Sequence, residues 1–348
     1  SVVGWSGVSH PSTKEVSHPP SNLLEILPMG KFPIVLPAIK GLFPKEIPQT
    51  PLAGRTKFFL ENWKKLTNDQ ILLEMVSGYR IPFLENPPPV LSQNPYVSQV
   101  SQDMRELIQE EVKSMLLKGA IVTVTPSPEQ FVSPLFLVPK KDQGQRPVIN
   151  LKNLNKFIPY EHFKMEGLFL VKEILKQGDW MLKIDLKDAY FAIPLDQHSQ
   201  RFVRFEWDKT LYQFQCLCFG LSPAPRVFSK ILKVPISLLR RLGIRLIIFL
   251  DDILLIASTP EELRQMRDTT IFLLQSLGFL INVKKSVFEP TQKIEFLGMI
   301  IDSIKMTLSL PEEKVVAIKK QCSEMLEKEK VPLRELSKLV GRLSASML

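Results

Sequence analysis

The chain has 348 residues, 45% of them hydrophobic and 23% charged, which is ordinary for a globular protein and enough for two or three subdomains. Its formal net charge of +9 favours a polyanionic partner. Three cysteines form no disulfide framework and indicate a reducing, intracellular compartment. Two adjacent aspartates interrupt the longest apolar run, which argues against a membrane span. Because the first residue is serine, we expect the chain to be a piece of a longer protein.

The first hundred residues are rich in proline and fall into two parts. Residues 1–55 show no sustained hydrophobic period, which predicts an irregular tail. Residues 56–95 predict one or two short helices, capped in the second case by Thr67 or Asn68, and then a proline-rich linker. A packing or linker element is the favoured interpretation of this segment, and a docking segment for a template is the alternative.

A basic turn is predicted after the next helix. Apolar residues at helical spacing predict a helix over 101–117 that ends at Gly119, followed by strands over 120–124 and 131–139. The turn that follows carries Lys140, Lys141 and Arg146, which can grip phosphate oxygens. An ordinary solvated turn explains the same charges.

The sequence 245–258, RLIIFLDDILLIAS, predicts a tight hairpin of two buried strands with Asp251 and Asp252 at its bend. Two neighbouring carboxylates between apolar strands repel one another and lose hydration, so they favour a bound cation. Carboxylate oxygens that leave room for water and phosphate suit Mg²⁺. A solvated acidic turn is the alternative.

A third carboxylate, Asp185, ends another apolar strand, where aspartate is unfavourable. We interpret it as a candidate metal ligand that the carbonyl of Leu186 assists. Asp188 is expected to cap the next turn in a structural role, and Tyr190 is expected to lie against whatever Asp185 binds.

The rest of the chain predicts further helices and one more hairpin. A hairpin is expected around 208–210. Four helices are expected: one over 227–242, one from Thr259 to Gly278, one that begins at Pro311 and is capped by Ser309, and one over 333–343. Arg240, Arg241 and Arg245 suit either a structural role or template contact.

Several motifs together resemble a known family. They are SPLFLVPKKDQGQRPVINLKNLN at 133–155, KIDLKDAY at 183–190, QCLCFGLSPAPRVFSKIL at 215–232, FLDDILLIA at 249–257 and FLG at 296–298. In this order and spacing they resemble the reverse transcriptases of retrotransposons, most closely DIRS-type elements and next gypsy-like elements. The segment HFKMEGL at 162–168 favours the DIRS type. The resemblance covers roughly residues 55–348.

The resemblance implies an α+β fold, a right-hand polymerase with an antiparallel palm sheet backed by helices. Its parts would be an irregular tail at 1–55, a helical segment and linker at 56–95, fingers at 96–160, a palm at 161–305 with a fingers insertion at about 195–216, and the start of a thumb at 306–348.

The resemblance also implies roles for individual residues. Two Mg²⁺ or Mn²⁺ ions would be held by Asp185, Leu186, Asp251 and Asp252. The nucleotide would be bound by Lys140, Lys141, Arg146, Tyr190, Phe219 and Gly220. The primer would be steadied by Phe296, Leu297 and Gly298, and the general acid would be Lys284 or Lys285. Phe249 replaces the usual tyrosine and Cys218 a usual proline, but neither departure removes a metal ligand.

The implied activity is RNA-directed DNA polymerisation by transfer from a deoxynucleoside triphosphate to a primer 3′-hydroxyl, on an RNA or DNA template. An RNase H region is expected after the chain. One alternative is an inactive or co-opted remnant that binds nucleic acid or protein. Another is an RNA-templated RNA polymerase, against which Tyr190 argues.

Overall fold

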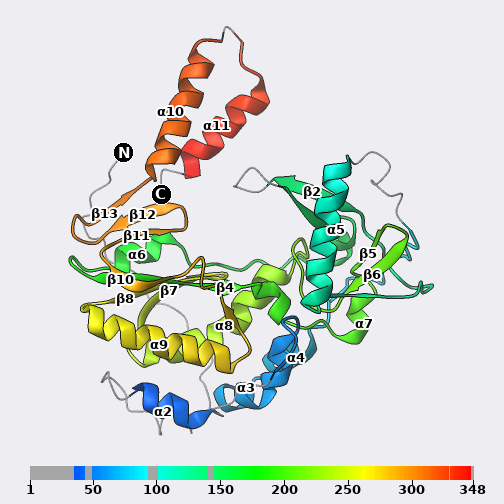
Figure 1. Cartoon of the computed structure of the whole chain (residues 1–348), viewed down its shortest axis with the longest axis horizontal. Coiled ribbons are helices and arrows are strands. Elements are labelled where there is room, and N and C mark those ends of the chain that lie inside the picture. The colour runs from blue at the N-terminus through cyan, green and yellow to red at the C-terminus, as the bar shows by residue number, and fades with distance from the viewer. Residues whose placement is uncertain (1–34, 44–48, 93–100, 140–144, 329, 346–348) are drawn as a thin grey trace.

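We describe a computed structural model of the chain, which covers residues 35–43, 49–92, 101–139, 145–328 and 330–345. A central sheet with helices below it occupies one side of the molecule, a second lobe built around helix α5 occupies the other, and the helix pair α10–α11 rises above the sheet (Figure 1). In the part of the chain described, no helix is both long and apolar enough to cross a membrane.

The central sheet is antiparallel and is buried on both faces. Its strands are β4 (Trp180–Lys187), β7 (Arg245–Phe249), β8 (Asp252–Ala257) and β10 (Val287–Thr291) in the order β10-β4-β8-β7, and β9 (Leu280–Ile281) also pairs with β4. Along β8, Ile253 and Leu255 join one apolar cluster, whereas Leu254 and Ile256 join the other. Because strand side chains alternate between faces, a sheet covered on both faces needs the continuous apolar runs seen in the sequence.

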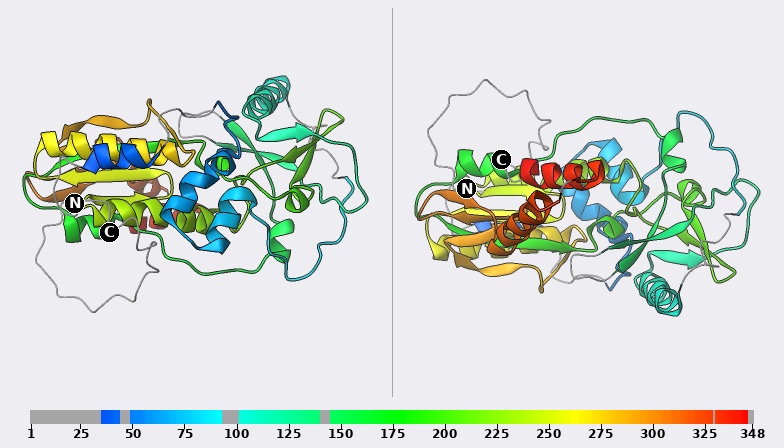
Figure 2. Two further views of the ribbon diagram at one scale, coloured as in Figure 1. Left: turned by 90° about the horizontal axis from the view of Figure 1, so that it is seen from below. Right: turned by 90° about the horizontal axis from the view of Figure 1, so that it is seen from above.

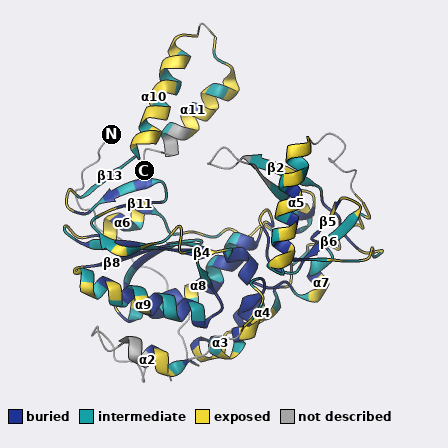
Figure 3. Ribbon diagram, viewed as in Figure 1, coloured by how far each residue is buried: buried dark blue, intermediate teal, exposed yellow. Residues whose placement is uncertain are grey.

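The lower face of this sheet packs on helices α8 (Ala224–Arg241) and α9 (Pro260–Ser276) (Figures 1 and 3). The predicted cap of α9 is confirmed, since the Thr259 hydroxyl accepts the Glu262 N–H at 3.2 Å and Pro260 occupies the first turn. The predicted helix over 227–242 is also confirmed, but it begins three residues earlier, at Ala224.

The upper face is covered by a second small sheet and a short helix. Strands β11 (Lys293–Phe296), β12 (Met299–Asp302) and β13 (Thr307–Ser309) form an antiparallel meander, and α6 (Leu168–Ile174) lies beside it. Phe296 and Ile301 pack with Ile247 and Leu254 of the central sheet. The β11–β12 turn therefore lies directly above the central sheet.

The second lobe combines segments from two distant parts of the chain. Its elements are α5 (Gln102–Leu117), β1 (Ile121–Thr123), β2 (Leu135–Pro139), β3 (Gln145–Ile149), the 3₁₀ helix η3 (Leu154–Phe157), α7 (Gln197–Gln200), β5 (Arg204–Trp207) and β6 (Thr210–Phe214). β6 pairs with β1, which precedes it by about ninety residues, rather than with the central sheet. The predicted helix before Gly119 and the predicted hairpin around 208–210 are both confirmed.

Helix α2 corrects the prediction of an irregular tail for residues 35–42, whereas residues 1–34 of that tail lie outside the described residues. Helix α2 (Val35–Leu42) lies along α9, and Ile39 is fully buried in the main core (Figure 2). Elements η1 (Arg55–Phe59), α3 (Leu60–Leu66) and α4 (Gln70–Gly78) follow. Neither Thr67 nor Asn68 caps α4, because the carboxylate of Asp69 accepts the N–H groups of its first turn.

The same helices cap the C-terminal end of α9, where helix carbonyls lack partners. The Trp63 indole donates to the Leu277 carbonyl at 3.0 Å, and the Asn62 amide donates to the Ser276 carbonyl at 2.7 Å. These contacts favour the predicted packing role of this segment over the docking role.

The C-terminal helices differ in part from prediction. Helix α10 (Glu312–Leu326) begins after Pro311, and no side-chain hydrogen bond caps it; Ser309 is instead the last residue of β13. None of the side chains of α10 is buried, whereas α11 (Leu333–Ala345) buries Leu339. The helix pair therefore stands largely exposed above the sheet (Figure 3).

Candidate active site

The β7–β8 hairpin turns at Leu250 and Asp251, which corrects the predicted bend at Asp251 and Asp252. Phe249 and Asp252 are directly paired, so Asp252 is the first residue of β8. Leu250 has a φ of 54°, a left-handed conformation that glycine would adopt more easily at the first central position of such a turn. The one-residue difference places Asp251 at the turn and Asp252 on the sheet.

Asp185 lies opposite the hairpin on the neighbouring strand. It is paired with Asp252 across β4 and β8, and the N–H of Leu186 donates to the carbonyl of Asp251 at 2.9 Å. The structure therefore brings together the three acidic side chains that the sequence analysis singled out, at one end of two adjacent strands.

Burial and mutual repulsion disfavour the charged forms of these aspartates. Burial, and then the Asp251 charge, raise the pKa of Asp185, while burial and the Asp252 charge raise the pKa of Asp251. Burial and the Asp185 carboxylate raise the pKa of Asp252 to about 6, and a side-chain hydrogen bond joins the two groups. Such carboxylates gain from a nearby cation.

The donor set fits a hard divalent cation that also binds ligands from outside the protein. Carboxylate oxygens are ligands that Mg²⁺ prefers, and Mg²⁺ is commonly held by one or two carboxylates together with water and substrate phosphates. Among the described residues, no group of three or more acidic, histidine or cysteine side chains is arranged so that it could hold a metal ion by itself.

Lys285, rather than Lys284, acts on the acidic cluster. Its positive charge lowers the pKa of Asp185, Asp251 and Asp252 alike, although it is not the largest influence on any of them. Its side chain is exposed, so it can approach a ligand that lies over the carboxylates. Of the two predicted lysines, Lys285 is thus the candidate that lies near the cluster.

An aromatic group lies beside the carboxylates. The ring of Tyr190 is buried, with its centroid 5.0 Å from that of Phe219 and 5.4 Å from that of Phe228. Burial, and then the Asp251 charge, raise the pKa of Tyr190 to about 12, so its hydroxyl stays protonated near neutral pH. The ring of Phe219 is 47% exposed and can still contact a ligand.

Comparison with known proteins identifies the domain that contains this cluster. Residues 138–301 match the family described as reverse transcriptase (RNA-dependent DNA polymerase). This stretch is a reverse transcriptase domain. Asp185, Asp251 and Asp252 all lie within it.

The reverse transcriptase domain is related to retroviral and retrotransposon Pol polyproteins. The chain is 27% identical over 220 residues to the Drosophila melanogaster protein "Retrovirus-related Pol polyprotein from transposon gypsy", and this alignment covers 61% of the chain and 20% of that protein. The chain thus spans about a fifth of the length of this curated relative.

Solved structures with a similar fold include the foamy viral protease–reverse transcriptase. The structure of that protein in complex with dsDNA superposes on this chain with a TM-score of 0.62 and is 20% identical in sequence; the match covers 87% of this chain and 64% of the foamy viral chain. Its structure in complex with an RNA/DNA hybrid gives a TM-score of 0.64 at 18% identity, and the match covers 96% of this chain and 41% of the foamy viral chain. This likeness confirms the predicted α+β fold with antiparallel sheets and helices.

The loop that carries Phe219 and Gly220 is held by a residue that the sequence analysis missed. The side chain of Asn155 donates to the Gly220 carbonyl at 2.8 Å and accepts the Ser222 N–H at 3.0 Å. Gly220 has a φ of 92°, and a Cβ there would lie 3.2 Å from the Ile149 carbonyl oxygen. Asn155 thus ties this loop of the reverse transcriptase domain to η3.

The predicted primer contact at 296–298 forms the β11–β12 turn. Leu297 and Gly298 both have positive φ, 49° and 76°, as a two-residue hairpin turn of this kind requires. Phe296 is fully buried, so it anchors the turn rather than facing a ligand, and Lys314 donates to the Gly298 carbonyl at 2.9 Å.

The predicted phosphate contacts in the basic turn are placed only in part. Lys140 and Lys141 lie outside the described residues. The backbone of Arg146 belongs to β3, where it pairs with Val138 of β2.

Of the three arginines at the C-terminal end of α8 and just after it, two favour the predicted structural alternative. Arg245 forms a two-pronged ion pair with Asp179. Arg240 pairs with Glu166, whose carboxylate also accepts the Ile248 N–H on the edge strand β7. Asp188 does not cap η4 (Ala189–Ala192) by its side chain, but its ion pair with Lys118 at 3.0 Å supports the structural role expected of it.

Proposed function

We propose that the chain is an RNA-directed DNA polymerase from a retrotransposon polyprotein, most like those of DIRS-type elements, and that an RNase H region follows it. One observation carries the proposal: Asp185 faces Asp252 across two adjacent strands, with Asp251 at the turn beside them. The motif phrasing FGLSPAPRVF and HFKMEGL supports the DIRS assignment.

In this proposal Asp185 and Asp251 hold the metal ions, Asp252 completes the acidic site and the Leu186 carbonyl assists. Two divalent ions, Mg²⁺ or Mn²⁺, would activate the primer 3′-hydroxyl and neutralise the phosphates when bound. The protein mainly positions the reactants and balances their charge, as phosphoryl transfer generally requires.

The remaining candidate residues orient the nucleotide and the primer. Tyr190 packs under the sugar and leaves no room for a 2′-hydroxyl, while Phe219 and Gly220 line the same pocket. Lys285 can donate a proton to the departing pyrophosphate, because it is the exposed lysine whose charge reaches all three aspartates. Lys140, Lys141 and Arg146 would bind the triphosphate, and the 296–298 turn would steady the primer end.

The proposed partner is a primer annealed to an RNA or DNA template. The net charge of +9 supports a polyanionic ligand, and the foamy viral structures hold dsDNA and an RNA/DNA hybrid. The lobe around α5 corresponds to the fingers, the central sheet with α8 and α9 to the palm, and α10–α11 to the start of the thumb. Because fingers and thumb would contact phosphates, affinity for primer–template should fall as salt rises.

The direct test is incorporation of dTMP on poly(rA)/oligo(dT) with Mg²⁺, by the wild type and by Asp251→Asn. The substitution keeps the size of the side chain but removes a ligand charge, so we expect incorporation to fall by about 10³-fold or more. Primer–template affinity should change little, because phosphate contacts elsewhere set it. Asp208→Asn, at the exposed β5–β6 turn, is the matched control and should leave incorporation unchanged.

Full activity of Asp251→Asn would disprove the metal assignment. A wild-type chain that binds primer–template but incorporates neither deoxynucleotides nor ribonucleotides would support the co-opted remnant instead. Preference for ribonucleotides would identify an RNA polymerase and remove the role of Tyr190.

A further inference from the structure

We infer that the turn at residues 282–286 is a positioning element for Asp185, and that it acts through Asn282 and Ser286. This inference rests on the proposed function, since it concerns the metal-binding geometry of Asp185. It adds two residues that have no role in the site described above.

The first observation is a break in the sheet beside Asp185. One edge of β4 pairs continuously with β8 from Trp180 to Asp185. The other edge is shared by two strands: β10 pairs with β4 at Lys183, and β9 pairs with it at Leu186. Between these two strands the chain leaves the sheet over residues 282–286, so the ladder is interrupted next to Asp185.

Side-chain and backbone groups of the turn fill this break. The Asp185 N–H donates to the Ser286 hydroxyl oxygen at 2.9 Å, and the Asn282 N–H donates to the Asp185 carbonyl at 2.8 Å. The Ser286 hydroxyl in turn donates to the Asn282 carbonyl at 2.7 Å. Both backbone groups of Asp185, a residue that is only 7% exposed, are thus satisfied by the turn.

The turn also contacts the functional end of Asp185. A hydrogen bond from the Asn282 side chain to the Asp185 carboxylate favours its charged form. The turn therefore holds Asp185 at three points: its N–H, its carbonyl and its carboxylate. A regular strand would have paired only the two backbone groups, and it would have left Asp252 as the hydrogen-bond partner of the carboxylate.

A carboxylate that accepts hydrogen bonds from neighbouring protein groups keeps one orientation, and this raises the affinity of the site for a metal ion. Ser286 fixes the backbone from which the Asp185 side chain projects, and Asn282 fixes the carboxylate itself. Lys285 lies between these two residues, so the same turn brings its charge to the acidic cluster. Asn282 and Ser286 are positioning residues, because they act through Asp185.

The test compares Ser286→Ala with Ser286→Thr in the whole 348-residue chain. Affinity for Mn²⁺ alone is measured by electron paramagnetic resonance of the free ion, and kcat and the KM for dTTP are measured on poly(rA)/oligo(dT). We expect Ser286→Ala to weaken Mn²⁺ binding by about 10–100-fold and to lower kcat by a similar factor, with little change in KM. Ser286→Thr keeps the hydroxyl and should restore both values to near those of the wild type.

Ser303→Ala is the matched control for stability. The Ser303 hydroxyl is fully buried and donates to the Asp179 carbonyl at 2.5 Å, at a site remote from the acidic cluster in the β12–β13 turn. Its loss should destabilise the fold without changing Mn²⁺ affinity. Should Ser286→Ala fail to fold, Asn282→Ala removes the amide contact but keeps the backbone bonds, and about a 10-fold weaker Mn²⁺ affinity is expected.

Wild-type Mn²⁺ affinity and kcat in Ser286→Ala, or wild-type Mn²⁺ affinity in Asn282→Ala, would overturn the inference. An equal loss of Mn²⁺ affinity in Ser303→Ala would do the same, because the effect would then be one of general stability. A wild-type chain without polymerase activity would disprove the proposed function, while the Mn²⁺ measurements would still decide the role of the turn.

Discussion

Breaking the ion pair between Asp179 and Arg245 on one side is expected to destabilise the central sheet. The Asp179 carboxylate accepts hydrogen bonds from both terminal nitrogens of Arg245, at 2.6 and 2.9 Å, and a third from the Lys176 N–H at 2.7 Å. The side chain of Asp179 is 4% exposed and that of Arg245 is 24% exposed. The pair joins the start of β7 to the loop before β4.

Replacing Asp179 by alanine would leave the Arg245 guanidinium largely buried, with the Ile174 carbonyl at 2.9 Å as a remaining partner. Breaking a buried ion pair on one side costs about 3–5 kcal/mol, since the other charge stays desolvated. Water can reach part of Arg245, so we expect a loss near the lower end, about 3 kcal/mol. The free energy of unfolding is measured by urea titration, with tryptophan fluorescence and circular dichroism as the two probes.

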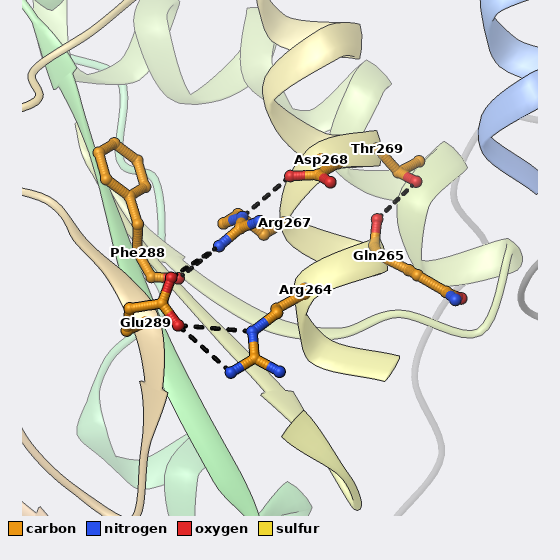
Figure 4. Close-up of polar contacts among 7 residues, drawn as sticks. All are labelled: Arg264, Gln265, Arg267, Asp268, Thr269, Phe288 and Glu289. Carbon is orange, nitrogen blue, oxygen red and sulfur yellow. Dashed lines mark hydrogen bonds and ion pairs between the residues drawn. The ribbon is translucent and has the colours of Figure 1, made fainter. Parts of the chain in front are cut away.

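Glu289→Ala is the matched control. Glu289 pairs with Arg264 and Arg267 of α9 at 3.3 and 3.5 Å, but its side chain is 74% exposed (Figure 4). Solvent-screened pairs of this kind contribute about 0–1 kcal/mol. A loss in Asp179→Ala no larger than that in Glu289→Ala would refute the reasoning. The double variant Asp179→Ala/Arg245→Met should recover part of the loss, because it removes the unpaired charge.

Two further predictions follow from burial. Cys216 and Cys218 are buried, and burial raises the pKa of Cys218 to about 12. Iodoacetamide at pH 8 should therefore label Cys322 of the folded chain first, as mass spectrometry can show. Labelling of Cys218 at the rate of Cys322 would contradict this prediction. Burial raises the pKa of Asp252 from 3.8 to about 6, so the folded chain binds this proton more tightly than the unfolded chain. In EDTA, the free energy of unfolding of the wild type should therefore rise relative to that of Asp252→Asn as pH falls from 7 to 5, and a constant difference would contradict this sign.

The sequence was sufficient to predict the parts of the site that depend on local pattern. Apolar runs that stop at Asp185 and Asp251 indicated buried strands ending in carboxylates, and Thr259 followed by Pro260 indicated the start of a helix. The position of the hairpin bend was wrong by one residue, because the pairing of Phe249 with Asp252 places Leu250 in a conformation that leucine rarely adopts. Local propensity gives no signal for such a residue when tertiary pairing sets the register.

The contacts that hold the site could not be predicted for a different reason. Asn282 and Ser286 meet Asp185 across about a hundred residues of sequence, and Asn155 meets Gly220 across 65. Asparagine and serine near a lysine pair look like an ordinary polar turn, so nothing in the local sequence separates a hydrogen-bonding role from solvation. Helix α2 was missed because its burial depends on α9, which lies more than two hundred residues further along the chain.

Two unfavourable features lie side by side at one end of the central sheet. Leu250 carries backbone strain of about 1–2 kcal/mol, and next to it three partly buried carboxylates repel one another. Apolar side chains of β4, β7 and β8 pack into the two hydrophobic clusters, and they supply the contacts that stabilise this end of the sheet. Glycine at position 250 would relieve the strain, and an asparagine in the cluster would relieve the repulsion, so neither feature serves the stability of the isolated chain. A divalent cation would offset the repulsion directly, which is why we interpret the strained turn and the acidic cluster as parts of a single site.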